Sequence, residues 1–256
     1  MMMTKNIIIT GASRGIGREM ALELGKQGHN LLLLARDEDK LKSVCDELKD
    51  SNISVHYLKC DVTEKSEVND AIEYAKRLMG TIDIAILNSG VAGSGYFKDF
   101  QSDKLRNIFD VNVFGIAYFM EGLIPIMKEQ GYGTIAGVSS LADLRGIPGN
   151  AAYCASKSSV TFLLDAARVE LAEYGISVIT IKPGFVKSDM TANNAFFMPF
   201  LMESEEAAKI IVNGIMSGKK RIAFPLPMVF LSWLGKIVPS TLFEYLIGLY
   251  GKPINQ

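Results

Sequence analysis

Short apolar runs alternate with longer amphipathic stretches over the first 190 residues. Runs rich in β-branched and apolar residues predict six strands, at Lys5–Thr10, Asn30–Ala35, Ser54–Cys60, Asp83–Leu87, Thr134–Val138 and Ile176–Lys182. Apolar residues at helical spacing predict five helices, at Gly15–Gln27, Glu38–Asp50, Glu64–Met79, Ser102–Glu129 and Ala152–Tyr174. Several strands are apolar on both faces, which is typical of a parallel sheet covered by helices on both sides. The pattern predicts an α/β fold: a single doubly wound, Rossmann-like domain over residues 1–256, with a parallel sheet of about seven strands.

The predicted helix Ala152–Tyr174 has two apolar stripes. One stripe holds Val160, Leu163, Leu164, Ala167 and Leu171. The other holds Ala155, Ser159, Phe162, Ala166 and Val169. Because a helix packs only one side on its own sheet, we expect the second stripe to contact another element or another subunit.

Composition removes several classes of function. The chain has 27 Lys and Arg residues against 28 Asp and Glu residues, so it lacks the basic excess of a nucleic-acid binder. Three widely spaced cysteines and two histidines give no metal-ligand cluster and no disulfide framework. The N-terminal apolar run is too short for a signal peptide, so we expect a cytoplasmic protein with reduced, buried thiols.

A glycine-rich loop, Thr10-Gly11-Ala12-Ser13-Arg14-Gly15-Ile16-Gly17, joins the first strand to the first helix. Glycines allow a tight turn and let a pyrophosphate approach the amides at a helix N-terminus, where the helix dipole favours an anion. The spacing differs from the standard dinucleotide fingerprint, so the loop could also be a plain turn. Its place at the first strand–helix junction favours a dinucleotide site.

Two arginines predict the choice of cofactor. The second strand ends at Ala35 without the acidic residue that would hold the ribose hydroxyls of NAD, and Arg36 follows. Arg14 lies in the glycine loop. Two guanidinium groups near the adenosine ribose suit a 2′-phosphate, so we expect NADP(H) rather than NAD(H).

A tyrosine and a lysine share one face at the start of a predicted helix. Tyr153 and Lys157 are four residues apart, and a nearby ammonium is expected to lower the pKa of the phenol, which would make it a usable acid or base. Ser140 follows the strand Thr134–Val138, and Asn112 lies in the preceding long helix. We expect these polar groups near the carboxyl ends of the parallel strands, where such folds bind ligands.

Over roughly residues 5–190 the chain resembles the one-domain short-chain dehydrogenase/reductase family. The matching motifs are the glycine loop, Asp61-Val62, Asn88-Ser89-Gly90, Asn112, the Ser140/Tyr153/Lys157 set and Pro183-Gly184. There are two departures: Ser89 stands where the family usually has alanine, and Asp143 stands where many members have glycine or alanine. Ser89 is small enough to leave cofactor binding intact, whereas we expect Asp143 to alter the substrate wall.

The resemblance implies an NADPH-dependent reduction of a carbonyl group to an alcohol. Tyr153 would protonate the oxygen, Lys157 would hold the nicotinamide ribose and lower the pKa of Tyr153, Ser140 would bind the carbonyl oxygen, and Asn112 would hold a proton-relay water. The implied cofactor-binding residues are Gly11, Ser13, Arg14, Gly15, Ile16, Gly17, Arg36, Asp61, Val62, Asn88, Ser89, Gly90, Tyr153, Lys157, Pro183, Gly184, Val186 and Ser188. It also places the long helix beside Ala152–Tyr174, which predicts a homodimer or homotetramer through these two helices.

The segment at about 187–202 corresponds to the family's substrate lid. Its stretch 190–202 has no charged residue but three phenylalanines and three methionines, which favours an apolar carbonyl substrate; alternatively these side chains only pack the lid on the body. The substrate itself is not indicated.

An apolar extension at about 223–251 follows the lid region. It is interrupted by Pro225, Pro227, Pro239, Lys236 and Glu244, so it is not a membrane-spanning helix. Three interpretations stay open: internal packing beside the lid, contact with another subunit, and contact with a membrane surface, of which the last is not favoured at this point.

Two rival functions remain. A catalytically silent NADP-binding sensor or scaffold would not need the Ser140/Tyr153/Lys157 set. An epimerase or dehydratase of the related extended group would need an added substrate domain, for which 256 residues leave little room.

Overall fold

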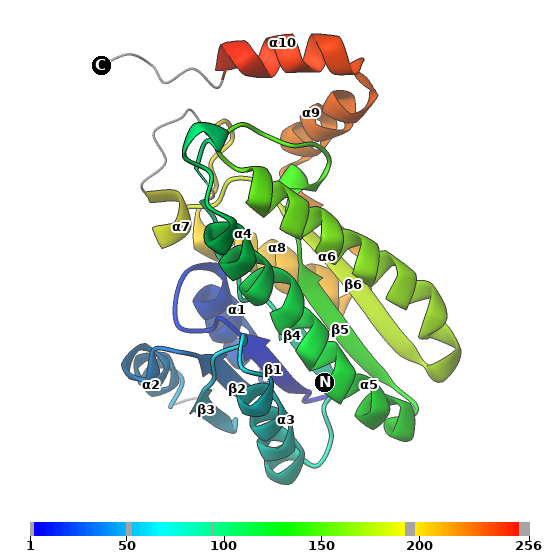
Figure 1. Ribbon diagram of the computed structural model, residues 1–256. Helices are drawn as coiled ribbons and strands as arrows, with labels where there is room; N and C mark the ends of the chain where they lie inside the picture. The colour runs from blue at the N-terminus through cyan, green and yellow to red at the C-terminus, as the bar shows by residue number, and fades with distance from the viewer. Residues whose placement is uncertain (1–2, 50–52, 94, 193–197, 251–256) are drawn as a thin grey trace.

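The computed structural model describes residues 3–49, 53–93, 95–192 and 198–250. Seven parallel strands form one sheet in the order β3-β2-β1-β4-β5-β6-β7 (Figure 1). Their bounds are β1 Asn6–Thr10, β2 Asn30–Ala35, β3 Val55–Lys59, β4 Ile84–Leu87, β5 Gly133–Val138, β6 Ile176–Pro183 and β7 Arg221–Phe224. The expected doubly wound α/β fold is therefore confirmed. The strand order reverses between β1 and β4, and the carboxyl ends of these two strands mark the place where such sheets bind ligands.

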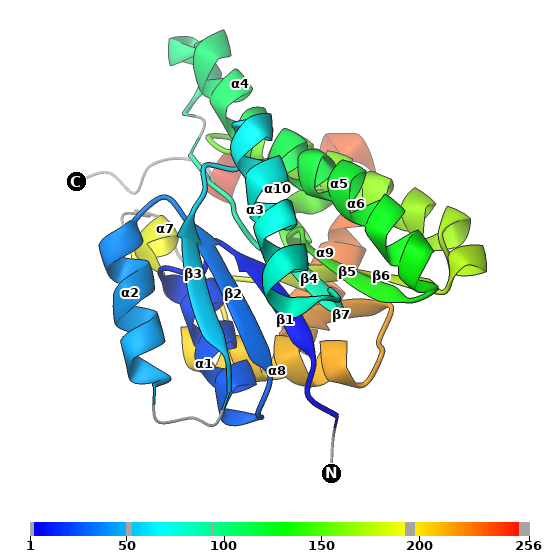
Figure 2. The ribbon, with the colours of Figure 1, turned by 90° about the horizontal axis from the view of Figure 1, so that it is seen from below.

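Helices cover both faces of the sheet (Figures 1 and 2). One face carries α1 Gly15–Lys26, α2 Glu38–Glu47 and α8 Ser204–Met216, and the other carries α3 Lys65–Met79, α5 Gly115–Gln130 and α6 Ala151–Glu170. Successive side chains of a strand point to opposite faces, so Ile7 and Ile9 join the first core while Ile8 joins the second. The expected end of the second helix at Asp50 lies outside the described residues.

The long helix expected at Ser102–Glu129 is interrupted. It divides into α4 Ser102–Phe109, a π-turn at Asp110–Phe114 (η2) and α5. Gly115 at the junction packs against Val62, where an added Cβ would lie 2.9 Å from Cγ2. The whole run Ser102–Gln130 is long and apolar enough to cross a membrane, but α5 packs on α3 as a core helix.

The two stripes of α6 differ in burial. Val160 and Leu164 of the first stripe are fully buried, whereas Phe162 and Val169 of the second are 73% and 78% exposed. Leu163 is exposed, contrary to expectation, because the face that packs on the sheet follows the i, i+4 line through Val160 and Leu164. The second stripe is thus left uncovered by the chain's own described residues.

The C-terminal extension starts later than expected. Its first residues belong to the short strand β7, which could not be distinguished in the sequence from the apolar run that follows it. After β7 come two helices, α9 Leu226–Ile237 and α10 Ser240–Tyr250. Both lie above the carboxyl ends of the strands (Figure 1). No residue of α9 is fully buried, although α9 packs on β7 and on the turn Leu141–Asp143, so packing beside the lid stays a prediction.

Candidate active site

The loop between β1 and α1 is shaped for close approach. Gly11 has a positive φ of 65°, and a Cβ on Gly17 would lie 2.1 Å from the main-chain oxygen of Gly11, so only glycine fits there. Among the described residues no side chain caps the N-terminus of α1, which leaves its first amides available to an anion. Gly15 and Ile16 open this helix. The cradle therefore fits the pyrophosphate of a dinucleotide.

Thr10 joins the carboxyl ends of β1 and β4. Its Oγ1 accepts hydrogen bonds from the main-chain nitrogens of Asn88 at 2.9 Å and Ser89 at 3.0 Å, and Asn88 Nδ2 donates to the Thr10 oxygen at 3.1 Å. Beyond them, a Cβ on Gly90 would come within 3.3 Å of Lys157 Nζ. Thr10 was not expected to have a role of its own. It is a hydroxyl residue at the end of an otherwise apolar strand, and this feature of the sequence could have indicated it.

The two arginines expected at the adenosine end lie at the surface, each near a carboxylate. Arg36 Nη1 lies 3.7 Å from Asp61 Oδ2, and Arg14 Nη1 donates to Asp189 Oδ2 at 2.9 Å. Asp61 is itself held by Thr63, whose main-chain nitrogen and Oγ1 donate to Oδ1. Exposed ion pairs of this kind contribute little free energy, so both guanidinium groups can turn to a phosphate.

The segment after β6 returns to the glycine loop. Pro183 ends β6, the Gly184 nitrogen donates to the Phe224 oxygen at 2.8 Å, and Val186 pairs with Met202. The Ser188 side chain lies beside Gly15, where an added Cβ would be 3.4 Å from Ser188 Cβ. Ser188, one of the cofactor-binding residues that the resemblance implies, is thus placed next to the glycine loop.

The lid begins with α7, Asp189–Ala192. The Lys187 nitrogen donates to the Met202 oxygen at 2.9 Å, and the Met202 nitrogen donates to the Phe185 oxygen at 3.0 Å, so the two ends of the lid are tied together. Phe196 and Phe197 lie outside the described residues.

Ser140, Tyr153 and Lys157 come together at the carboxyl end of β5. Tyr153 and Lys157 lie one turn apart on α6, and the Lys157 ammonium is 5.8 Å from the centre of the Tyr153 ring. Ser140 caps a short 3-10 turn, η3 Leu141–Asp143, and its side chain is hydrogen-bonded to Tyr153. The acid, its hydroxyl partner and the ammonium therefore lie together at the carboxyl end of β5.

Burial governs the proton affinities of this set. Desolvation raises the pKa of the Tyr153 phenol, while the hydrogen bond with Ser140 opposes that shift. The expectation that Lys157 lowers the pKa of Tyr153 is wrong for this structure, because the Lys157 ammonium donates to the Val138 oxygen at 2.8 Å instead of to the phenol. Tyr153 is consequently a neutral phenol at physiological pH, which is the form that donates a proton.

Burial also lowers the pKa of Lys157 to about 8. The unfolded chain binds this proton up to a pH near 10.5, so the folded protein is penalised below pH 8 and regains stability as the pH rises from 8 to 10.5. We expect Lys157→Met to increase the free energy of unfolding at pH 7 by about 3 kcal/mol, although activity is lost. Urea unfolding at pH 7 and pH 10 measures this gain, which should shrink at the higher pH; an equal gain at both would contradict it.

Asn112 lies fully buried in the π-turn and clamps two elements together. Its Oδ1 accepts from the Val91 nitrogen at 2.8 Å, and its Nδ2 donates to the Val91 oxygen at 3.0 Å and to Ser156 Oγ at 2.9 Å. Ser156 Oγ in turn donates to the Tyr153 oxygen. The side chain thus ties the loop after β4 to the turn of α6 that carries Tyr153. Its expected role in holding a relay water stays a prediction.

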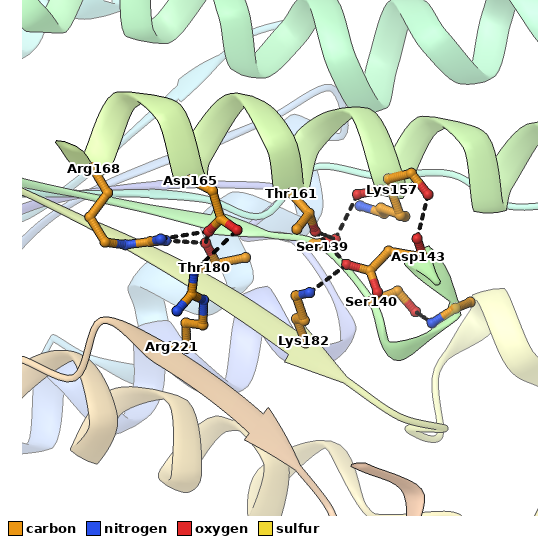
Figure 3. A network of polar contacts seen from close by, with 12 residues as sticks. Ser139, Ser140, Asp143, Lys157, Thr161, Asp165, Arg168, Thr180, Lys182 and Arg221 are labelled. Atoms are coloured by element: carbon orange, nitrogen blue, oxygen red, sulfur yellow. Dashed lines mark hydrogen bonds and ion pairs between the residues drawn. The ribbon is translucent and has the colours of Figure 1, made fainter. Parts of the chain in front are cut away.

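A buried carboxylate beside the catalytic set was not expected from the sequence. The Asp143 side chain is 1% exposed, and its Oδ2 accepts from Lys182 Nζ at 2.6 Å and from Thr161 Oγ1 at 2.5 Å (Figure 3). Ser139 Oγ bonds to Thr161 Oγ1 and donates to the Lys157 oxygen. Asp143 is therefore a part of the framework behind the site and not of the substrate wall, and its charge adds to the rise in the pKa of Tyr153.

Comparisons with known proteins agree with this geometry. The family model described as short chain dehydrogenase matches residues 5–198. An uncharacterised oxidoreductase of Myxococcus xanthus is 35% identical over 240 residues, covering 94% of this chain and 95% of the relative. A 3-oxoacyl-(acyl-carrier-protein) reductase of Staphylococcus epidermidis is 33% identical over 190 residues, covering 74% of this chain and 78% of the relative.

Solved structures support the same fold. A short chain dehydrogenase/reductase from Burkholderia phymatum, in complex with NAD, superposes with a TM-score of 0.83 at 21% identity over 99% of this chain and 97% of that chain. An alcohol dehydrogenase from Thermococcus sibiricus, complexed with 5-hydroxy-NADP, gives a TM-score of 0.78 at 22% identity over 86% of this chain and 94% of that chain.

Proposed function

The chain belongs to the short-chain dehydrogenase/reductase family of NAD(P)-dependent oxidoreductases, and on this premise we propose that it uses NADPH to reduce the carbonyl group of an apolar ketone, aldehyde or acyl compound. The observation that carries the proposal is the neutral, half-buried phenol of Tyr153, hydrogen-bonded to Ser140 and one helical turn from Lys157. A protein that only binds a cofactor has no use for a proton donor kept in this state. The same residues serve the reverse oxidation.

Each residue of the set has a separate task. Tyr153 donates its proton to the carbonyl oxygen as negative charge develops there, and the Ser140 hydroxyl donates a hydrogen bond to the same oxygen. Donors fixed before the reaction stabilise such a charge strongly, because they need no reorganisation. The Lys157 ammonium and the glycine loop hold the cofactor, which supplies the hydride when bound.

Apolar surfaces near Tyr153 support the substrate class. A hollow of about 190 Å³ lies at the start of α6, next to Tyr153 in the chain. Its apolar lining includes Phe97, Phe100, Leu105 and Ala152. On the lid, Phe200 and Leu201 are exposed. A ketone or acyl chain without charge is the compound that such walls accommodate.

Turnover with NADPH tests the proposal. The protein is incubated with NADPH and linear ketones and aldehydes of increasing chain length, and NADPH absorbance is followed. We expect kcat/KM to rise with chain length. Tight NADPH binding without turnover on any member of the series would instead favour the sensor or scaffold.

Cofactor preference provides a second test. A charge-assisted hydrogen bond contributes about 1.5–3 kcal/mol, so we expect kcat/KM with NADPH to exceed that with NADH by at least about tenfold. Arg36→Ala should lose most of this preference and keep its activity with NADH. Lys40→Ala, which removes another exposed cation of the same region, is the control. Equal use of both cofactors by the unaltered enzyme would contradict the assignment of Arg14 and Arg36.

The exposed stripe of α6 supports a homodimer or homotetramer. Phe162 and Val169 stand on it beside small residues, so a symmetric copy could approach closely. We expect Phe162→Glu to yield monomers or insoluble protein, because like charges would meet across the two-fold axis. Light scattering measures the mass. A monomeric unaltered protein at micromolar concentration would contradict this assembly.

A further inference from the structure

The two C-terminal helices expose an apolar surface, here called the C-terminal patch. Its members share high exposure and are Leu226, Phe230, Leu231, Trp233, Leu234, Ile237, Leu242 and Tyr245. In α9, Leu226, Phe230, Trp233 and Ile237 recur every three or four residues and share one face. Phe230, Trp233 and Ile237 are 60%, 54% and 57% exposed. Side chains of this size, gathered without cover, mark an interaction surface.

The patch is attached to the loop that carries the catalytic serine. Arg145, five residues beyond Ser140, donates to the Lys236 oxygen at 3.2 Å and to the Val238 oxygen at 2.6 Å, and its guanidinium lies 4.6 Å from the centre of the Phe243 ring. In Figure 1 the two helices stand on the same end of the molecule as the lid helix α7. The two C-terminal helices and the lid helix therefore lie at the same end of the molecule.

Charge distinguishes the kind of partner. The thirty residues 222–251 contain only two charged side chains, Lys236 and Glu244. Lys236 is exposed and lies about a quarter-turn around α9 from the shared apolar face, so it flanks that face. Arg145 contacts the C-terminal end of α9, so among the described residues two cations, Arg145 and Lys236, stand against Glu244 at the patch. This arrangement complements a surface that is apolar inside and anionic at its rim.

We propose that the C-terminal patch docks the protein on an anionic lipid surface, with α9 lying in the plane of the interface. Phe230, Trp233 and Ile237 enter the boundary of the acyl chains, while Lys236 extends to the headgroups. A symmetric second copy would bring one carboxylate, Glu244, for the two cations Arg145 and Lys236, whereas an anionic lipid surface supplies a counter-charge for both. The end of the molecule that carries the lid then lies near the membrane, where apolar compounds concentrate.

Trp233 is the single tryptophan of the chain and reports on the patch directly. The full-length protein is titrated with vesicles of phosphatidylcholine alone and with vesicles of phosphatidylcholine and phosphatidylglycerol. We expect a shift of tryptophan emission to shorter wavelength and flotation with the vesicles, both several-fold stronger on the anionic ones. Absence of both signals on anionic vesicles would overturn the proposal.

Variants separate lipid docking from other occupants. Phe230→Glu/Ile237→Glu should weaken partitioning at least about tenfold, since two buried apolar side chains are replaced by charges. Lys236→Glu leaves the apolar face intact and should weaken binding to anionic vesicles alone. Tyr132→Glu, an exposed aromatic on the opposite end of the sheet, is the matched control and should bind normally. NADPH binding verifies that each variant is folded.

Subunit contact through the patch is the competing outcome. It is indicated if Phe230→Glu/Ile237→Glu lowers the mass of the assembly in sedimentation while the unaltered protein leaves vesicles unbound. Equal binding of the unaltered protein and of both patch variants would also overturn the proposal, because the contact would then lie elsewhere.

Discussion

Tyr153→Phe is expected to lower kcat for carbonyl reduction by about 10²–10⁴-fold, the usual contribution of a positioned general acid. The variant removes one oxygen atom and keeps the half-buried ring, so NADPH affinity should be nearly unchanged. Without the phenol, the oxygen that gains negative charge keeps only the hydrogen bond of Ser140. Single-turnover kinetics at saturating NADPH measure the chemical step directly.

A matched phenol elsewhere controls for the substitution itself. Tyr132 is exposed at the other end of the sheet, and Tyr132→Phe should keep the turnover of the unaltered enzyme. If Tyr153→Phe retained most of its turnover as well, Tyr153 would not be the proton donor.

Lys182→Met should lower the free energy of unfolding by about 3–5 kcal/mol, the usual cost of leaving one member of a buried ion pair alone. Lys182 Nζ is the cation within 2.6 Å of an Asp143 carboxylate that is almost fully buried. After the substitution, Thr161 alone would donate to Oδ2 of that carboxylate. Urea unfolding gives the change in free energy.

Two further variants identify the cause of that loss. Asp143→Leu/Lys182→Met removes both charges and should recover most of the stability, because apolar residues can replace a buried pair. Lys187→Met removes the cation of an exposed pair with Glu203 and should cost only about 0–1 kcal/mol. Similar small losses for Lys182→Met and Lys187→Met would show that the Asp143 pair is open to water.

Local signals predicted much of this molecule from its sequence. Six strands were placed to within one residue at each end, because parallel strands that are buried on both faces form unbroken apolar runs. Tyr153 and Lys157 were linked by helical spacing, and Ser140 was linked to them by its position after β5. The glycine loop was identified because a turn that approaches an anion closely needs glycine at Gly11 and Gly17.

Features that depend on distant contacts were not predictable in this way. The π-turn around Asn112 leaves the apolar periodicity of the long helix almost intact. Asp143 and Lys182 are far apart in the sequence. They meet because β5 pairs with β6, with Val138 opposite Ile181, so that the turn after β5 lies beside the end of β6. The direction of the Tyr153 pKa shift was predicted wrongly because burial, which dominates it, is a property of the whole fold.

The packing of α1 against α8 has a consequence for synthesis on the ribosome. Met20, Ala21 and Leu24 of α1 belong to the same core as Ala207, Ala208 and Ile211 of α8, yet α8 starts about 180 residues after α1 ends. At about 5–20 residues per second, translation takes roughly 10–40 s to deliver the covering helix. During that interval the apolar face of α1 is exposed on the nascent chain, because the residues that cover it have not been made. Chaperones that bind exposed apolar segments therefore have more time to bind α1 than to bind helices that are covered by nearby residues.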